Sequence, residues 1–187
     1  MLDVRRATAA LALGLVFGLV PARAESEPSG PGYVDAKRLV DAVGEDHVKV
    51  RISLSGSILR ALAGAGEDPE LKNVLSGLES IRAVILDLGL GERAARARKA
   101  ARDLEADLRG QRWQELAYIQ DEGSTVRVLT KSDDKDRVLG LVVLVLDTSD
   151  DEPALVFANV TGTIDLAKLQ QIGKGFNVPG LSDLDLK

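Results

Sequence analysis

Two apolar runs dominate the hydrophobic pattern, Val138–Leu146 and Ala154–Ile164, and a polar TSDDEP segment separates them. Each run is too short to span a bilayer, and its Val and Leu content is typical of strands. The pair predicts a buried β-hairpin at the centre of the fold. Both arms are apolar on both faces, so a helical layer on one side would cover only half of the side chains. The other half must meet a second layer or a partner.

Strict alternation of apolar and polar residues predicts another strand at Val48–Ser55, whose polar side we expect to face water. The run Ile81–Leu88 is apolar on both sides apart from Arg82 and Asp87, which places it inside the sheet. Two more strands, predicted at Trp113–Gln120 and Thr125–Lys131, are joined to each other and to the hairpin by short polar turns. The second half of the chain is therefore an antiparallel meander.

Helical spacing predicts a long amphipathic helix from about Glu92 to Arg109. Its buried stripe is formed by Ala97, Ala101, Leu104 and Leu108, and its other side is rich in arginine. Shorter helices are predicted within 34–43, from Ser57 to about Leu62, from Pro69 to about Gly77, and after Asp165 as the N-cap residue.

The order of elements is thus strand, helix, strand, helix, four strands and helix. It predicts an α+β fold, a two-layer sandwich whose mixed, mostly antiparallel sheet of about six strands has helices mainly on one face. We expect one domain over 33–187, with a C-terminal tail at 176–187 that packs back on it. Residues 25–32 are rich in Glu, Ser, Pro and Gly and predict a flexible leader.

The N-terminus has the order of a secretory signal peptide: basic residues, an apolar run of about 14 residues, and a small-residue site that predicts cleavage after Ala24. The run is shorter than the roughly 20 residues of a spanning helix. No Cys follows it, which excludes a lipid anchor of the lipoprotein type. We therefore expect a periplasmic or secreted protein of about 163 residues with no stable membrane span.

The net charge limits the classes of partner that we expect, and the cysteine content excludes disulfide and thiol chemistry. The 187-residue chain has a formal charge of −5, and loss of residues 1–24 with their three Arg and one Asp takes it to about −7. An acidic surface disfavours nucleic acid and anionic lipid as general partners. Cysteine is absent, so the fold uses no disulfide and thiol chemistry is impossible.

Metal-ligating residues are sparse. His47 is the only His, which together with the absence of Cys excludes a zinc site of the usual type. Two acidic loops, 133–136 and 147–152, could offer oxygen ligands, but neither has the spacing of a calcium-binding loop. We interpret both as solvated hairpin turns, and no metal or cofactor site is predicted.

Serine catalysis has little support. Ser53, Ser55 and Ser57 cluster around one glycine without the Gly-x-Ser-x-Gly pattern. An extended strand would place His47 about 20 Å or more from Ser53, at roughly 3.3 Å per residue. A Ser–Lys pair with Lys49 or another lysine stays formally open.

Three further features have ordinary structural interpretations. Asp87 is an acid in an apolar strand, but it also stands at the exposed strand end before Gly89, which we favour. The arginine-rich helix face contains Asp and Glu as well, and few aromatics could stack on bases, so it predicts a solvated surface. Trp113 either anchors its strand on the core or contacts a partner.

The C-terminal half, WQELAYIQDEGSTVRVL, DRVLGLVVLVLD and ALVFANVTGTIDLAKLQQIGKGFNVPGL, resembles the exported bacterial proteins of the domain of unknown function 4252 family. GYVDAKRL, VKVRISLSGSILRAL and DPELKNVLSGLESIRAVIL fit the same order upstream. The resemblance implies export, sometimes as a lipoprotein, and no established activity, cofactor or catalytic residue. Without the lipoprotein Cys, this chain differs from the anchored members.

These observations predict a non-enzymatic envelope protein that binds a partner or ligand. Its contact is expected through the sheet or hairpin, with another envelope protein or a second copy of itself, or in an apolar groove with a lipid-like ligand. No catalytic, cofactor-binding or metal-binding residue is predicted. The alternative is a hydrolase or other enzyme that uses carboxylate or Ser residues.

Overall fold

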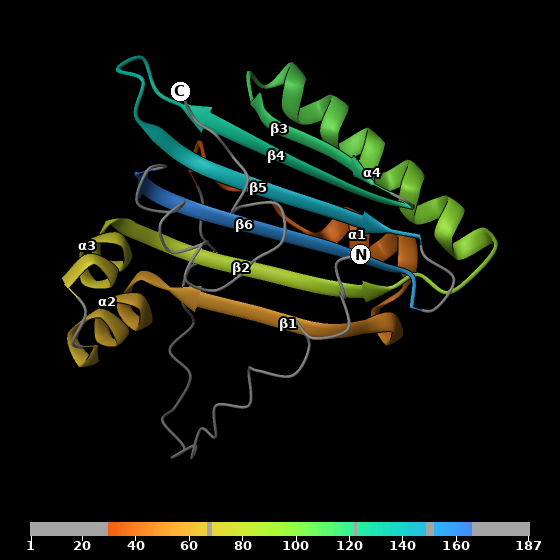
Figure 1. Cartoon of the computed structure of the whole chain (residues 1–187), viewed down its shortest axis with the longest axis horizontal. Coiled ribbons are helices and arrows are strands. Elements are labelled where there is room, and N and C mark those ends of the chain that lie inside the picture. The colour runs from red at the N-terminus through yellow and green to blue at the C-terminus, as the bar shows by residue number, and fades with distance from the viewer. Residues whose placement is uncertain (1–29, 67–68, 122, 149–151, 166–187) are drawn as a thin grey trace.

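The computed structural model describes residues 30–66, 69–121, 123–148 and 152–165 (Figure 1). The expected signal peptide, residues 25–29 of the leader, the terminal helix and the tail lie outside the described residues. The elements follow in the predicted order and are α1 (Lys37–Val43), the 3-10 helix η2 (Glu45–His47), β1 (Val48–Ser55), α2 (Gly56–Ala65), α3 (Pro69–Gly77), β2 (Leu78–Asp87), α4 (Glu92–Gly110), β3 (Gln114–Asp121), β4 (Ser124–Ser132), β5 (Val138–Asp147) and β6 (Ala154–Ile164).

The six strands form one sheet in the order β1-β2-β6-β5-β4-β3, which confirms the predicted six-stranded α+β sandwich. Every neighbouring pair is antiparallel, so the sheet is antiparallel throughout rather than mixed. The reason is that α2 and α3 form a short excursion at one end of the sheet, so β2 returns directly alongside β1. The chain then crosses the sheet through α4 to β3 at the opposite edge, and the strands that could have paired in parallel are never neighbours.

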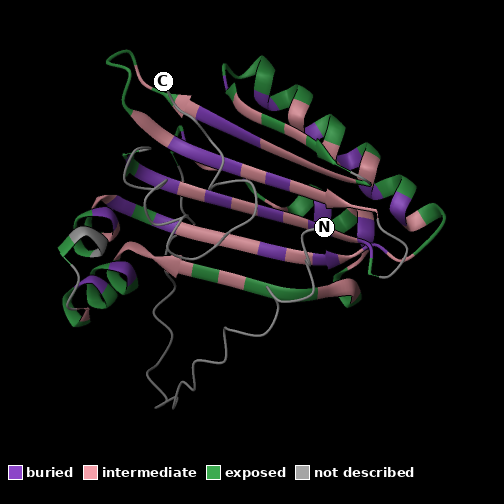
Figure 2. Cartoon of the chain, viewed as in Figure 1, coloured by how far each residue is buried: buried purple, intermediate pink, exposed green. Residues whose placement is uncertain are grey.

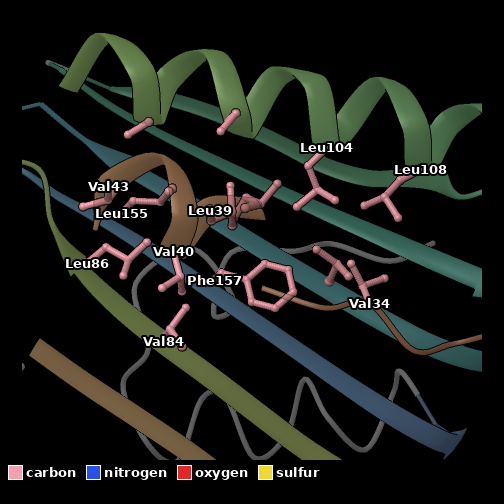
Figure 3. Close-up of a cluster of buried hydrophobic side chains, with 14 of the residues drawn as sticks. Val34, Leu39, Val40, Val43, Val84, Leu86, Leu104, Leu108, Leu155 and Phe157 are labelled. Atoms are coloured by element: carbon pink, nitrogen blue, oxygen red, sulfur yellow. The ribbon is translucent and has the colours of Figure 1, made fainter. Parts of the chain in front are cut away.

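The main core lies between the sheet and the layer of α1 and α4, on what we call the helical face. Phe157 of β6 is 1 % exposed and stands at its centre (Figure 3). Leu39 of α1 and Leu104 and Leu108 of α4 point toward the same region (Figure 3). Burial of one such large side chain contributes about 1.5–3 kcal/mol, so this cluster accounts for much of the stability.

The second set of hairpin side chains lies on the opposite face of the sheet. Leu141 of β5 and Val128 of β4 belong to a second buried cluster, with Leu59 of α2 and Val74 of α3. Both short helices pack at one end of this face (Figure 1). Most apolar residues farther along it are half-buried, and Val50 of β1 is 40 % exposed (Figure 2). A second helical layer therefore covers part of the face among the described residues.

Some boundaries differ from those expected. The strand β2 begins at Leu78 rather than at the expected Ile81, although Leu78 fits the helical spacing of the preceding segment, and α3 ends at Gly77 as expected. The helix α2 continues through Gly64 to Ala65, because its last turns pack against α3. On α4 the buried stripe includes Ala94 and Ala100, whereas Ala101 is half-buried. No helix among the described residues has the length and apolar character needed to cross a membrane.

Candidate functional site

The junction of β1 and α2 begins the candidate site. Ser55 ends the extended strand and Gly56 starts the helix, but Ser55 makes no side-chain capping bond; its hydroxyl lies 2.7 Å from the Ser57 hydroxyl. A Cβ at Gly56 would lie 3.1 Å from Nη1 of Arg60 and 3.1 Å from the carbonyl oxygen of Glu79. Glycine at this position therefore leaves room for the Arg60 guanidinium beside the start of the helix.

Arg82 is the charged residue at the heart of the site. It lies on β2 between Ser53 of β1 and Asn159 of β6, on the helical face of the sheet. Its Nη1 donates to the Tyr33 hydroxyl at 3.3 Å, and the guanidinium carbon is 5.3 Å from the centroid of that ring. Its Nε is buried and has no hydrogen-bond partner among the described residues. The described protein groups therefore leave one donor of this partly buried cation unsatisfied.

The N-terminal segment that carries Tyr33 is fastened to the sheet by Asn159, which is fully buried. Its Nδ2 donates to the carbonyl oxygens of Gly32 and Leu141 at 3.0 and 3.1 Å, and its Oδ1 accepts from the Val34 amide at 3.0 Å. Backbones approach closely where the segment crosses β5, since a Cβ at Gly140 would lie 2.5 Å from Gly32 Cα. Gly32, placed by its sequence in the leader, is therefore buried against the sheet.

A buried hydroxyl pair lines the site from β2 and β6. Ser80 and Thr161 lie 2.8 Å apart at Oγ and Oγ1, and each is at most 5 % exposed. The register shifts here between Leu78 and Ser80, and Gly162 follows with φ at +128°. Together these elements enclose a cavity of about 640 Å³, here called the polar cavity. Its lining residues are Gly30, Pro31, Gly32, Tyr33, Ser53, Leu54, Ser55, Gly56, Ser57, Arg60, Glu79, Ser80, Arg82, Leu139, Thr161, Gly162 and Thr163.

The polar cavity has an excess of positive charge. Arg60 and Arg82 line it against the single carboxylate of Glu79, in a chain whose formal charge is −5. Guanidinium and hydroxyl groups supply several hydrogen-bond donors. The arrangement can bind a polar ligand, and no lysine or histidine stands among the lining residues to act as a general base.

The serine cluster and His47 lie at opposite ends of β1. Ser53, Ser55 and Ser57 line the polar cavity, whereas His47 precedes the first residue of the strand. Nη1 of Arg93 lies 2.8 Å from Nδ1 of His47, so the imidazole is engaged beside α4. The structure therefore does not bring the imidazole to the serines.

The acidic residues considered as candidates from the sequence lie in or next to turns, where they accept hydrogen bonds. Asp87 ends β2, and its Oδ1 accepts from the Gly89 amide at 3.0 Å. Asp133 accepts from the amide and the guanidinium of Arg137, and these bonds, the amide first, lower the pKa of its carboxyl. Residues 149–151 of the second acidic loop are outside the described ranges. Within those ranges no group of three or more His, Asp or Glu side chains is placed to hold a metal ion.

Several basic residues of α4 lie at the surface and form ion pairs within the helix. Lys99 bonds Asp103, which lowers the pKa of that carboxyl, and Arg109 bonds Glu105 at 2.9 Å, as the i, i+4 spacing predicts. Trp113 is 4 % exposed, and its amide donates to a carbonyl at the end of α4, so it anchors the start of β3 on the core. Neither feature contributes to the polar cavity.

Sequence reasoning predicted no site residue and missed Arg82. The available signal was a charged residue in the middle of an apolar strand, where burial is costly without a partner. The other charged residue that the sequence shows in this apolar run, Asp87, lies at the end of the strand. No sequence pattern marks Tyr33 as a site residue, because its position depends on the hydrogen bonds that the buried Asn159 makes to the segment around it.

Three comparisons relate the chain to known proteins. A family model described as domain of unknown function (DUF4252) matches residues 44–172. No curated protein matches. Among solved structures, the Saccharomyces cerevisiae Ran-binding protein Mog1p is similar at 15% identity, over 59% of this chain and 60% of that chain, with a TM-score of 0.28. A likeness at that level carries no argument about function.

Proposed function

The chain belongs to the DUF4252 family, a domain of unknown function, and from its own geometry we propose that it is a non-enzymatic ligand-binding module that works outside the cytoplasm. The binding site in this proposal is the polar cavity. The single observation that supports it most is a cavity of about 640 Å³ lined by two arginines and by hydroxyl side chains from β1, α2, β2 and β6. Cavities that hold small molecules typically measure about 300–1,000 Å³.

The walls of the polar cavity suit binding because they are built on regular structure. Its lining comes from β1, β2 and β6, from the first turns of α2, and from the segment at 30–33 that Asn159 fastens. Side chains on strands and helices keep their geometry better than those on loops, which lowers the entropy lost when a ligand binds.

Two observations favour binding over catalysis. The three serines in the polar cavity have no lysine or histidine beside them in its lining, so neither a Ser–His nor a Ser–Lys pair is present there. The described acids 87 and 133 accept bonds from nearby amides in turns outside the lining.

Export remains part of the proposal and rests on the N-terminal pattern alone. Residues 1–24 have the order of a signal peptide, and the proposed location is the periplasm or the outside of the cell. Fusion of residues 1–30 to a reporter that is active only outside the cytoplasm should give signal. A mature chain that begins at Glu25 by mass spectrometry would support cleavage after Ala24, and a retained N-terminus would contradict it.

The ligand-binding proposal is tested by filling the cavity. Ser53 is exposed on the edge strand β1 and lines the cavity, so Ser53→Trp should occupy the space with little cost to a strand that tolerates aromatic side chains. Gln114→Trp, exposed on the other edge strand β3, is the matched control. A small-molecule library is screened by ligand-observed NMR. Compounds that bind wild type and Gln114→Trp but not Ser53→Trp would support the proposal, and a library in which no compound distinguishes the variants would contradict it.

A second candidate function is self-association through the sheet. Val50, Ile58 and Leu62 are 40 %, 43 % and 45 % exposed on β1 and the adjoining α2, and β1 is an edge strand. Edge strands can pair with a second copy around a two-fold axis. Sedimentation equilibrium should then show a dimer that Val50→Lys dissociates. A monomer at all concentrations would remove this candidate.

A further inference from the structure

The guanidinium of Arg82 indicates the chemistry of the ligand, because it lines the polar cavity and the described protein groups satisfy it only in part. A buried donor without an acceptor costs about 1–3 kcal/mol, and more when the group is charged. Asn159, its neighbour on β6, does not relieve that cost, because its Oδ1 accepts from the Val34 amide and not from Arg82 Nε. The Tyr33 hydroxyl is engaged by Nη1 of the same guanidinium. Because Arg82 lines the polar cavity, an anionic ligand there would offset the charge of this partly buried guanidinium.

A second guanidinium and three hydroxyls line the same cavity. Arg60 comes from α2, Ser53 from β1 and Arg82 from β2, so the donors approach from three different elements. Ser55 and Ser57 add hydroxyls at the start of α2, where Ser55 makes no side-chain capping bond. Donors on several sides suit a tetrahedral oxyanion better than a planar carboxylate, which is satisfied by one guanidinium fork.

From this arrangement we infer that the ligand carries a phosphate group, bound in the polar cavity by Arg82 and Arg60. The inference rests on the proposed function and names the chemical class of its ligand. Glu79 is the opposing charge in the lining, and the two arginines exceed it by one. Guanidinium is the side chain best matched to phosphate, since it donates two parallel bonds and is always charged.

The cavity is larger than a phosphate and has apolar parts. Pro31, Leu54 and Leu139 line it together with the polar groups. They suit the organic part of a phosphate ester, whose source is either a soluble metabolite or phosphatidic acid in a membrane. The shared chemistry is the phosphate monoester, and the two sources need separate arms in the experiment.

The direct test is calorimetric titration of the purified protein with inorganic phosphate, sn-glycerol 3-phosphate and succinate. Loss of one charge-assisted contact should weaken phosphate binding about 10- to 100-fold in Arg82→Gln and in Arg60→Gln. Arg60 is exposed, so its variant keeps the fold even if Arg82→Gln is less stable. Glu79→Gln should strengthen binding, because it removes the opposing charge. Arg102→Gln, which removes an exposed positive charge from α4 outside the cavity, should leave binding unchanged.

Several results would overturn the inference. The first is that the wild type binds succinate but not phosphate, and the second is that it does not bind phosphate at all. The third is that Arg102→Gln weakens phosphate binding as much as Arg60→Gln does. If wild type fails with phosphate yet binds a neutral compound that Ser53→Trp excludes, the phosphate inference falls and the ligand-binding function stands. If Ser53→Trp abolishes the binding of no compound, both the phosphate inference and the ligand-binding function fall.

A separate experiment with vesicles identifies a lipid source. Vesicles of phosphatidic acid in phosphatidylcholine, compared with vesicles of phosphatidylcholine alone, indicate a lipid ligand when they capture the wild-type protein and not Arg60→Gln. If neither kind of vesicle captures the wild-type protein but the protein binds sn-glycerol 3-phosphate, the source of the ligand is a soluble phosphate ester.

Discussion

Replacement of Asn159 by alanine tests how the polar cavity is held together. The side chain is fully buried and makes three hydrogen bonds, to Val34, Gly32 and Leu141. Each bond contributes about 1 kcal/mol net, and the partners left buried without water raise the total, so Asn159→Ala should cost about 3–5 kcal/mol. That is a large share of the roughly 5–15 kcal/mol by which a domain is stable.

The assay is urea unfolding monitored by circular dichroism. With a slope of about 2 kcal/mol per molar urea, the midpoint of Asn159→Ala should fall by roughly 1.5–2.5 M. Hydrogen exchange at the Val34 amide should accelerate more than exchange at the strand amides, because this amide loses its acceptor directly.

Asn73→Ala is the matched control. Asn73 is exposed on α3, and alanine is the better helix former, so its unfolding free energy should stay within about 0.5 kcal/mol of wild type. If Asn159→Ala loses less than about 1 kcal/mol and its Val34 amide stays protected, the side chain does not fasten the segment and the reasoning is refuted.

Three other changes test the packing and the charges. Phe157→Ala, at 1 % exposure, should lower the free energy of unfolding by about 3–5 kcal/mol in denaturant titration, and a loss under 1 would contradict its central place. Gly140→Ala places a Cβ 2.5 Å from Gly32 Cα, and this overpacking should cost about 1–3 kcal/mol in the same titration; an unchanged midpoint would show that the backbones are not so close. Asp133 has a lowered pKa because the Arg137 amide and guanidinium favour its charged form, so its stabilisation is present above its unfolded pKa of about 4 and is lost as pH falls through the folded value. Asp133→Asn should therefore lose less stability than wild type between pH 6 and pH 3, and parallel losses would count against the contact.

Local patterns were sufficient to predict the elements but not their arrangement. The bounds of β1 are confirmed because period-two alternation runs through all of Val48–Ser55. The pairing of β2 with β6 joins Val84 to Phe157, residues far apart in the chain, and no local pattern contains that pairing. The sheet was predicted as mixed for the same reason. Leu78 shows the limit of periodicity, since it fits the helix spacing and lies in a strand.

The family resemblance, stated from the residues, is confirmed by the family match over 44–172. The site could not be predicted in the same way. Arg82 was visible as a charge in an apolar strand, but its significance depends on Ser53 and Asn159 on flanking strands, and on Tyr33 from the N-terminal segment. The proposed site is formed by tertiary pairing, and no motif local in the chain contains it. The predicted partner contact through the sheet stays a proposal.

The most direct test of the account is the Arg82 Nε–Hε resonance in ¹H–¹⁵N NMR spectra, assigned by its absence in Arg82→Gln. We predict that sn-glycerol 3-phosphate shifts this resonance, because a phosphate bound to the guanidinium changes the surroundings of its Nε–Hε group. The Arg102 resonance should stay in place over the same titration. An Arg82 signal that does not change at saturating ligand, or one that moves only as much as that of Arg102, would contradict the claim that the polar cavity binds a phosphate through Arg82.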